Sequence, residues 1–413
     1  MTGSGRQPTW RVLVDGDRVA VDPDGTVASV ADGLDGFAMA PEQLLDLDGP
    51  HPLQVLARPP DHEATAPLDW LPLDEASGPP PVLAAVRDAV ATYAGHAPLP
   101  PRRQPWFAAP WRAEADAWVD TALARQGRPR TGPSVPVKVW SLAAVLRIPT
   151  ESGPVFLKAS CDHFRAEPRI TALLGRLVPG RVPGVLDHEP DRGWQLMEPL
   201  DGVSDEDEPT LRLAAPTAAT IAGVQLDCVP HVALLRAAGS PERGLDSSLA
   251  AFGEVLAASP ELRLLDAEQL AAARNTLPEV ERRLAELAAY DVPTTLVHGD
   301  LHLGNVAEQD GRLTVFDWSD ASVGHPFVDL VTLVRSSPPD ERDELTAAYL
   351  AAWRDHLSGA DLARVVELAT VAEKVFQAVT YDRLQAAQED AAVWLMQGVV
   401  ARCLQQLTEA VAG

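Results

Sequence analysis

Two short segments in the C-terminal half place oxygen-bearing side chains directly after apolar strands. Residues 296–306 read Leu-Val-His-Gly-Asp-Leu-His-Leu-Gly-Asn-Val, and residues 312–320 end in Phe-Asp-Trp-Ser-Asp. One predicted strand therefore leads into a loop that carries Asp300 and Asn305, and a second strand ends at Asp317. Carboxylate and amide oxygens suit Mg²⁺, which keeps coordination positions open for phosphate. A carboxylate can also orient a hydroxyl and accept its proton, as phosphoryl transfer requires.

The composition is that of a folded protein with more than one domain. The chain has 413 residues, 46% of them hydrophobic and 23% charged, which argues against global disorder and suggests two to three domains. It lacks an uninterrupted apolar run of membrane-spanning length, and its first ten residues lack the apolar core of a secretory signal. Its three cysteines are few and far apart, so we expect a reducing, cytoplasmic location.

The net charge of −25 limits the possible partners. An acidic surface repels polyanions, so we expect no nucleic-acid partner, and we expect no membrane partner either. Such a surface would attract a cationic substrate, although solubility of an acidic cytoplasmic protein explains the charge more simply. The acidic run at residues 205–208 is the only local indication of a cationic ligand, and a solvated loop explains it equally well.

The first hundred residues predict a small α+β unit. Residues 10–14 and 18–22 alternate as a β-hairpin, residues 26–30 follow as a strand, and residues 81–93 show helical spacing. Proline-rich stretches at residues 58–81, 98–110 and 129–136 predict loops or linkers, because proline cannot donate to a ladder or a helix interior. We interpret residues 1–97 as a non-catalytic accessory domain and residues 98–110 as a linker.

The remainder predicts a small β-rich lobe followed by a large helical one. Residues 111–126 have helical spacing, and strand-like stretches follow at residues 135–140, 143–148, 154–158, 185–188 and 194–197, with a helix at about 162–177. Beyond residue 200 the chain is rich in Ala and Leu at helical spacing, apart from a β-rich island at residues 294–317. The predicted lobes span residues 111–198 and 199–413.

The two strand-end segments resemble those of the aminoglycoside phosphotransferase/choline kinase family, which has a bilobal protein-kinase-like fold. That family carries His-Gly-Asp, a few residues, Asn, and then an Asp-Trp strand end, a divergent form of the protein-kinase loops. The resemblance implies an α+β fold and ATP-dependent, Mg²⁺-dependent phosphorylation of a small-molecule hydroxyl. It implies that Asp300 is the catalytic base and that Asn305 and Asp317 bind magnesium, with His298 holding the loop. The expected role of Asp329, on the following helix, is to hydrogen-bond the catalytic-loop backbone.

A kinase-like site also needs a lysine on a strand, held by an acidic residue on the next helix. Lys158 ends the third predicted strand, and Glu167 follows nine residues later. Because Pro168 follows directly, either the helix begins near Glu167 or the carboxylate that pairs with Lys158 lies elsewhere. Glu198 and Leu200 stand where the family has its interlobe hinge and are assigned to nucleotide binding, although an ordinary strand exit fits as well. A glycine-rich phosphate loop is missing from the sequence.

Several assignments stay open at the level of sequence. His302 could contact phosphate or fill the loop, and we favour filling; Asp320 could assist a second metal or cap a turn. The position before Pro326 is often Asp in relatives and is His325 here. GTP could replace ATP, and neither the acceptor (amino sugar, aminoglycoside, choline or related metabolite) nor the oligomeric state follows from the sequence. The alternative function is a catalytically inactive nucleotide- or metabolite-binding regulator of the same fold.

Overall fold

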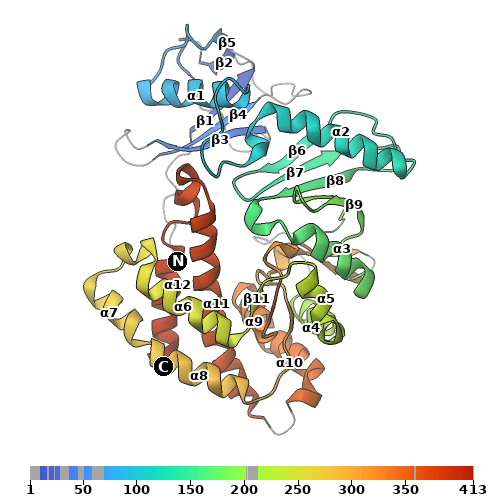
Figure 1. The fold of residues 1–413 in the computed structure, drawn as a ribbon, viewed down its shortest axis with the longest axis vertical. Helices are drawn as coiled ribbons and strands as arrows, with labels where there is room; N and C mark the ends of the chain where they lie inside the picture. The colour runs from blue at the N-terminus through green and yellow to red at the C-terminus, as the bar shows by residue number, and fades with distance from the viewer. Residues whose placement is uncertain are drawn as a thin grey trace. The chain divides into compact units, whose positions relative to one another are not determined.

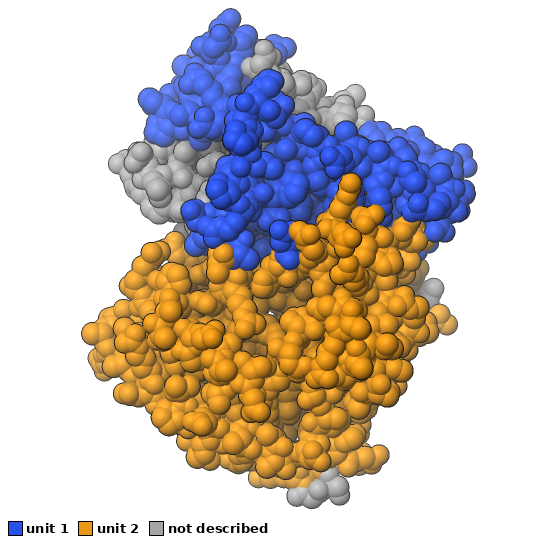
Figure 2. Space-filling model, in the orientation of Figure 1, with its two compact units in different colours: residues 1–162, 194–199, 387–395 blue, residues 163–193, 200–386, 396–413 orange. Residues whose placement is uncertain are grey.

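The computed structural model divides into two compact units (Figure 2). Unit 1 comprises residues 1–162, 194–199 and 387–395, and unit 2 comprises residues 163–193, 200–386 and 396–413. The residues that the structure describes are 10–15, 18–22, 24–27, 37–44, 51–57, 69–200, 202, 213–309, 311–357 and 360–412. The domain boundaries placed after residues 97, 110 and 198 stay predictions.

Unit 1 begins with a five-stranded sheet in the order β3-β4-β1-β2-β5, accompanied by helix α1 (Figure 1). The hairpin and the helix predicted from the sequence are confirmed, since β1 and β2 pair antiparallel. Alternate residues of the hairpin, such as Val12 and Val14, face the core of this unit. They pack against residues spaced by three or four along α1, such as Val82 and Val86. The bounds are β1 Trp10–Asp15, β2 Arg18–Val21, β3 Phe37–Leu44, β4 His51–Ala57, β5 Asp69–Pro72 and α1 Pro80–Tyr93.

Sequence reasoning missed three strands of this sheet. β3 and β4 were not predicted, and β5 lies inside the proline-rich stretch at residues 58–81 that predicts a loop. The prediction failed there because β5 pairs only with β2 and places Pro72 at its end, where a missing donor is tolerated. The strand predicted at residues 26–30 lies partly outside the described residues, and Thr26 and Val27 form isolated bridges.

The second sheet of unit 1 contains four of the five predicted strands of the β-rich lobe; the fifth, at residues 185–188, is β9 and belongs to unit 2. Within the unit they run in the order β6-β7-β8-β10, with antiparallel neighbours. β8 continues two residues beyond Lys158, so this lysine does not end its strand as predicted, because pairing with β7 and β10 extends the ladder. The bounds are η1 Pro105–Phe107, α2 Ala109–Arg125, β6 Val135–Val139, β7 Ala143–Ile148, β8 Val155–Ser160 and β10 Trp194–Met197.

A buried ion pair joins the linker of unit 1 to the segment at residues 387–395. Arg103 Nε lies 2.7 Å from Glu389 Oε2, and the two side chains are 4% and 3% exposed. The neighbouring pair Arg102–Asp390 is 44% and 92% exposed. Burial removes the charged groups of Arg103 and Glu389 from water, so the loss of one of them leaves the other as an uncompensated buried charge. In the exposed pair Arg102–Asp390, water solvates the charge that remains.

We therefore expect Arg103→Met to lower the free energy of unfolding by about 3–5 kcal/mol. The matched variant Arg102→Met removes the same charge from the exposed pair and should cost at most about 1 kcal/mol. Urea unfolding of the full chain measures both values. Equal losses in the two variants would contradict the distinction.

Unit 2 is mainly helical, as the sequence predicts. Its hydrophobic core joins α4, α6, α8, α9, α10, α11 and α12 through residues such as Ile221, Phe252, Leu284 and Leu368. The helix bounds are α3 Glu167–Leu177, α4 Ala214–Cys228, α5 Val232–Ala237, α6 Leu245–Ala258, α7 Ala267–Asn275, α8 Leu277–Ala288, α9 Phe327–Ser336, α10 Arg342–Ala352, α11 Leu362–Ala387 and α12 Val399–Ala412.

The helix expected at about residues 162–177 is divided. A short 3-10 turn, η2 Asp162–Phe164, precedes α3, which begins at Glu167 with Pro168 in its first turn. Proline is accommodated there because the first helical N–H groups have no partner within the helix. The helix therefore begins at Glu167, and the pairing of Glu167 with Lys158 stays a prediction.

One stretch of unit 2, Ala214–Ala237, is long and apolar enough to cross a membrane by length and composition alone. It covers α4, η3 (Val229–His231) and α5. Ala218, Ile221 and Val224 belong to the hydrophobic core of the unit. The stretch therefore has the pattern of a core helix, which passes the same test.

Short strands carry the segments singled out by the sequence. β12 pairs with β15, which also pairs with β11, whereas β13 and β14 form a hairpin. The bounds are β9 Val185–Glu189, β11 Glu242–Arg243, β12 Thr295–Val297, β13 Val306–Gln309, β14 Arg312–Val315, β15 Ser322–Gly324, η5 Leu303–Asn305 and η6 Trp318–Asp320.

Candidate active site

The hairpin β13–β14 brings the two sequence segments together. β12 leads into the loop at residues 298–305, from which β13 departs, and Val306 pairs with Val315 at the open end of the hairpin. The backbone N–H of Phe316 donates to the carbonyl of Asn305 at 2.9 Å. Because β14 returns beside the start of β13, the loop that bears Asp300 and the strand end that bears Asp317 are neighbours.

His298 connects these two segments from inside the core. It is fully buried, its Nε2 lies 2.9 Å from the carbonyl oxygen of Phe316, and its Nδ1 lies 3.3 Å from the backbone N of Asp300. A carbonyl can only accept, so Nε2 carries the proton and Nδ1 accepts from the N–H of Asp300. Burial lowers the pKa of this imidazole, which favours the neutral ring that both hydrogen bonds require. The arrangement fits the loop-holding role implied by the resemblance.

Asp329 makes the hydrogen bonds expected of it. From the first turn of α9, its carboxylate accepts from the backbone N–H of His298 at 2.7 Å and of Gly299 at 2.9 Å. Gln225 of α4 adds a third hydrogen bond, at 2.8 Å. Burial raises the pKa of this fully buried carboxyl to about 7, and the donated hydrogen bonds oppose that shift. Asp329 thereby fixes the backbone that precedes Asp300.

Gly299 is required by both its backbone angle and its surroundings. Its φ is +88°, and a Cβ at this position would lie 2.7 Å from the carbonyl oxygen of Asp320 and 2.9 Å from its Cβ. Those contacts are too short for any side chain. The close approach brings the loop against the last residue of η6, so a glycine here lets the two segments pack together.

We expect Gly299→Ala to lower the free energy of unfolding by about 2–4 kcal/mol, since a left-handed backbone and overpacking both penalise the new methyl group. Gly311 provides a matched control, with φ +76° and nothing within 4 Å of the added Cβ. Gly311→Ala should cost only the backbone penalty, about 1–2 kcal/mol. Denaturant unfolding of both variants separates the backbone penalty from the overpacking penalty. Losses of equal size would show that packing against Asp320 is unimportant.

Asp300 projects from this loop with its side chain 49% exposed. Burial raises the pKa of the carboxyl, but the hydrogen bond with His302 and the positive charge of that imidazole outweigh burial, so the pKa lies below the ordinary value of 3.8. The charge of Asp317 opposes this lowering of the pKa of Asp300. His302 Nε2 lies 3.6 Å from Asp300 Oδ2 and 3.0 Å from Asn305 Nδ2. Asp300 is therefore an ionised, solvent-facing carboxylate.

Asn305 and Asp317 present oxygen donors suitable for a divalent cation. Asn305 uses its amide nitrogen to donate to the carbonyl of Asp300 at 2.9 Å, which leaves Oδ1 as its ligand atom. Asp317 adopts the left-handed conformation, with φ 61°, and Ser319 donates to its Oδ1 at 2.7 Å. The left-handed region is uncommon for residues other than glycine, and Asp is one of the few that tolerate it. Among the described residues, no group of three or more His, Cys, Asp or Glu is placed to hold a metal.

Two neighbouring positions have identifiable surroundings. His325 is buried, its Nδ1 accepts from the N–H of Phe327 at 3.3 Å at the start of α9, and burial lowers its pKa to about 4. A neutral imidazole thus takes the place at which relatives often have Asp. Asp320 closes η6 and packs against Gly299 through its backbone and Cβ. Metal assistance and turn capping both stay open for Asp320.

The residues assigned to nucleotide binding are distributed over both units. Lys158 is buried on β8 of unit 1, opposite Gln195 of β10. Glu198, also in unit 1, forms an ion pair with Arg128 at 2.6 Å. Glu167 is buried at the start of α3 in unit 2, and α3 contacts η6. Leu200 is half-buried and belongs to unit 2. Their roles stay predictions.

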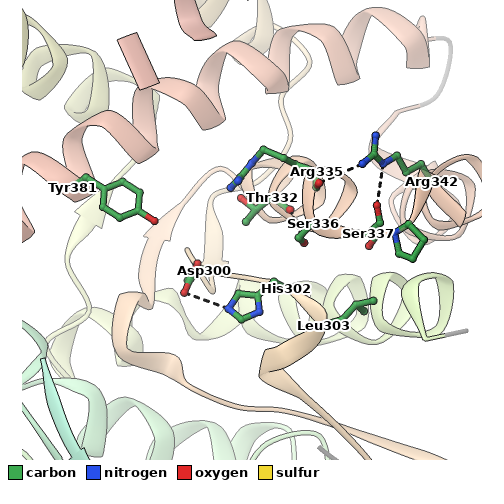
Figure 3. Close-up of a pocket in the computed structure, with 10 residues that line it drawn as sticks. Asp300, His302, Leu303, Thr332, Arg335, Ser336, Ser337, Arg342 and Tyr381 are labelled. Carbon is green, nitrogen blue, oxygen red and sulfur yellow. Dashed lines mark hydrogen bonds and ion pairs between the residues drawn. The ribbon is translucent and has the colours of Figure 1, made fainter. Parts of the chain in front are cut away.

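Sequence reasoning missed a pocket of about 530 Å³ that opens beside Asp300 (Figure 3). Besides the loop at residues 298–305, its walls come from α9, the segment leading to α10, and α11, and they include Arg335, Arg342 and Tyr381. Sequence reasoning also missed Gln377 of α11, which donates to the carbonyl of Gly299 at 3.1 Å. No local motif marks these residues, because they reach the loop only through helix packing.

The fold and the strand-end loops define a class of phosphate-transferring proteins with a kinase-like fold. The model of the phosphotransferase enzyme family known as APH matches residues 137–368, more than half of the chain. The chain therefore belongs to this family, as the motifs predicted. No curated protein matches the chain.

Solved structures of low sequence identity are similar to the chain. A choline/ethanolamine kinase family protein from Mesorhizobium loti is 19% identical, with 72% of this chain and 98% of that chain covered and a TM-score of 0.49. An ethanolamine kinase from Plasmodium vivax is 12% identical, with 67% and 83% covered and a TM-score of 0.49. A macrolide 2'-phosphotransferase from Brachybacterium faecium is 17% identical, with 71% and 97% covered and a TM-score of 0.45.

Proposed function

We propose that this protein transfers the γ-phosphate of ATP, with Mg²⁺, to a hydroxyl group of a small molecule. Family membership supports the reaction class. The observation that carries the proposal is the hydrogen bond from Phe316 N–H to Asn305, which ties the loop of Asp300 to the strand end of Asp317. An exposed carboxylate beside two oxygen ligands is the set of groups that phosphoryl transfer uses.

In this proposal Asp300 is the catalytic base. Its lowered pKa keeps it ionised at neutral pH, so it can accept a hydrogen bond from the acceptor hydroxyl and orient the oxygen. As the new O–P bond forms, the bond between the γ-phosphorus and the bridging oxygen breaks, and ADP leaves. The hydroxyl proton passes to the Asp300 carboxylate and then to solvent. His298 and Asp329 act indirectly, through the position of the loop.

The donor set of Asn305 Oδ1 and the Asp317 carboxylate fits magnesium, which takes few protein ligands and completes its shell with water and phosphate oxygens. A bound Mg²⁺ would neutralise phosphate charge. We assign Lys158 to the nucleotide phosphates, with Glu167 as its acidic partner, and Glu198 and Leu200 to the nucleotide-binding hinge. GTP is the alternative donor. Because the reaction consumes a nucleoside triphosphate, we expect the protein to act in the cytoplasm.

The test is a transfer assay with γ-labelled ATP or GTP, the full-length protein and a panel of hydroxyl compounds that includes amino sugars, choline and neutral sugars. We expect label in an acceptor only when Mg²⁺ is present, and we expect a chelator to abolish the transfer. Nucleotide binding without transfer to any acceptor would favour the inactive, regulatory alternative. Transfer that continues in the presence of chelator would contradict the assignment of Asn305 and Asp317.

A further inference from the structure

The pocket beside Asp300 is built entirely within unit 2 (Figure 3). Asp300 and His302 of the catalytic loop line one part of it, α9 contributes Arg335, and Arg342 and Tyr381 come from α10 and α11. A volume of about 530 Å³ is that of a site for a small metabolite. Because the carboxylate of Asp300 borders the pocket, a hydroxyl compound held there has access to the proposed base.

The charges of the wall differ from those of the whole protein. The pocket is lined by two arginines and one carboxylate, whereas the chain carries a net charge of −25. The Arg335 side chain is 50% exposed, and Figure 3 shows its guanidinium on the side of the pocket that holds Asp300 and Tyr381. At such short range, local charges outweigh the distant acidic surface, since screening suppresses interactions beyond about 10 Å.

Both arginines retain N–H groups for a ligand. A guanidinium has five N–H donors. Arg335 Nη2 contacts Glu373 at 3.3 Å, and Arg342 donates from Nε to the carbonyl of Ser337 at 3.1 Å and from Nη2 to that of Arg335 at 3.4 Å. Those contacts hold the side chains in place and leave further donors on each guanidinium. Planar guanidinium groups match the paired oxygens of carboxylate and phosphate.

The hydroxyl groups of the wall fall into two kinds. Thr332 and Ser336 of α9 donate to carbonyls of their own helix, so their protons are in use. Ser337 is 3% exposed, and its Oγ has no hydrogen-bond partner among the described residues. Burial first, and then the charges of Asp300, Cys403 and Asp320, raise the pKa of Tyr381 to about 12, so its hydroxyl keeps its proton. The Tyr381 hydroxyl is therefore a hydrogen-bond donor that an acceptor molecule can use, whereas the Ser337 hydroxyl is buried behind the wall.

We propose that the acceptor carries an anionic group, a carboxylate or a phosphate, which Arg335 binds while the acceptor hydroxyl reaches Asp300, and that Arg342 adds positive charge at the far end of the pocket (Figure 3). This inference rests on the proposed phosphoryl transfer and specifies its substrate class. The proposed acceptor has the opposite charge to the cationic substrate that the net charge of the chain would attract. A cationic acceptor would meet two guanidinium groups in this pocket, whereas an anionic one gains charge-assisted hydrogen bonds.

The test uses two series of compounds, each built on one carbon skeleton, whose members carry an anionic, a neutral or a cationic group. One series is glycerate, glycerol phosphate, glycerol and serinol, and the other is glucuronate, glucose phosphate, glucose and glucosamine. Isothermal titration calorimetry on the full-length protein measures binding, and labelled ATP with Mg²⁺ measures transfer. We expect at least one anionic member to bind about 10- to 100-fold more tightly than its neutral and cationic counterparts. Comparison of the carboxylate and phosphate members identifies the anionic group.

Substitutions of the two arginines test whether the preference for anionic compounds depends on this pocket. Arg335→Gln should remove about 10-fold or more of the anion preference and Arg342→Gln a smaller part, whereas Arg335→Lys should retain part of it because the charge stays. The matched control Arg354→Gln removes an exposed arginine that follows α10 and lies outside this pocket, so it should change nothing. Melting temperatures identify any variant that fails to fold, and Arg335→Lys, which keeps a positive charge at this position, then replaces Arg335→Gln.

The outcomes separate the inference from the proposed function. Equal or absent binding of the anionic members, or an anion preference that survives both glutamine variants, would overturn the inference. Transfer to glycerol, serinol or glucosamine in preference to the anionic compounds would also overturn it while leaving the phosphotransferase function intact. Arginine-dependent binding of an anionic compound without any transfer would support the anion site and contradict the proposed transfer.

Discussion

Replacement of Asp300 by Asn should reduce kcat for acceptor phosphorylation by about a hundred- to ten-thousand-fold. The amide keeps the size and hydrogen-bonding reach of the carboxylate but cannot accept the hydroxyl proton. Nucleotide affinity should change little, because Asn305 and Asp317, rather than Asp300, are assigned to the metal. Steady-state kinetics with labelled ATP and equilibrium nucleotide binding measure the two effects separately.

A control tests whether the loss is specific to this carboxylate. Asp355 is exposed in η8 (Arg354–His356), so Asp355→Asn removes one negative charge away from the catalytic loop and should leave kcat unchanged. The Asp300→Asn protein should also retain the wild-type melting temperature, since its side chain is half exposed. Wild-type activity in Asp300→Ala would eliminate Asp300 as the base.

The pH dependence follows from the lowered pKa of Asp300. A carboxyl whose pKa lies below 3.8 is ionised throughout the neutral range, and the basic form is lost only as the pH falls through that lowered value. We therefore expect no acidic limb from Asp300 in kcat between about pH 5 and pH 8. A limb in this range that disappears in Asp300→Asn would show that the pKa of the base is raised instead.

The sequence was sufficient for the parts of the site that depend on local spacing. Asn305 and Asp317 flank the two strands of the β13–β14 hairpin, which brings them together, and Asp300 lies five residues before Asn305 in the same loop. The two backbone hydrogen bonds of Asp329 are those that the family resemblance implies for the acidic residue on the helix after the metal loop. The family assignment rests on the same local motif.

Features built by distant segments could not be predicted. The pocket joins the catalytic loop to side chains such as Arg335 and Tyr381, which lie on two helices whose packing no local pattern specifies. Gln225, some seventy residues before the loop, reaches Asp329 for the same reason. Strand β5 and the last two residues of β8 are stabilised by pairing with neighbouring strands of their sheets. Proline content therefore predicted a loop in place of β5, and the hydrophobic run placed the end of β8 too early.

Removal of the Asp329 carboxylate should be the most damaging change to the fold of the site. Asp329→Ala leaves the backbone N–H groups of His298 and Gly299 buried without their acceptor. Each unsatisfied donor costs about 1–3 kcal/mol, so we expect the free energy of unfolding to fall by about 2–6 kcal/mol. Because these N–H groups precede Asp300 directly, kcat should fall as well, even at temperatures at which the variant is folded. Urea unfolding and steady-state kinetics measure the two losses.

The protonation of Asp329 gives a second, independent measurement. Its pKa in the folded protein is about 7, above the value of 3.8 for a free carboxyl, so folding favours the protonated form. The protonated Asp329 carboxyl therefore makes its full contribution to the free energy of unfolding below pH 3.8, and this contribution is lost as the pH rises toward about 7. Asp329→Asn cannot titrate, so the wild type should lose stability relative to this variant over that interval. A relative gain would mean that the three donated hydrogen bonds outweigh burial and hold the carboxylate ionised, with a pKa below the ordinary one.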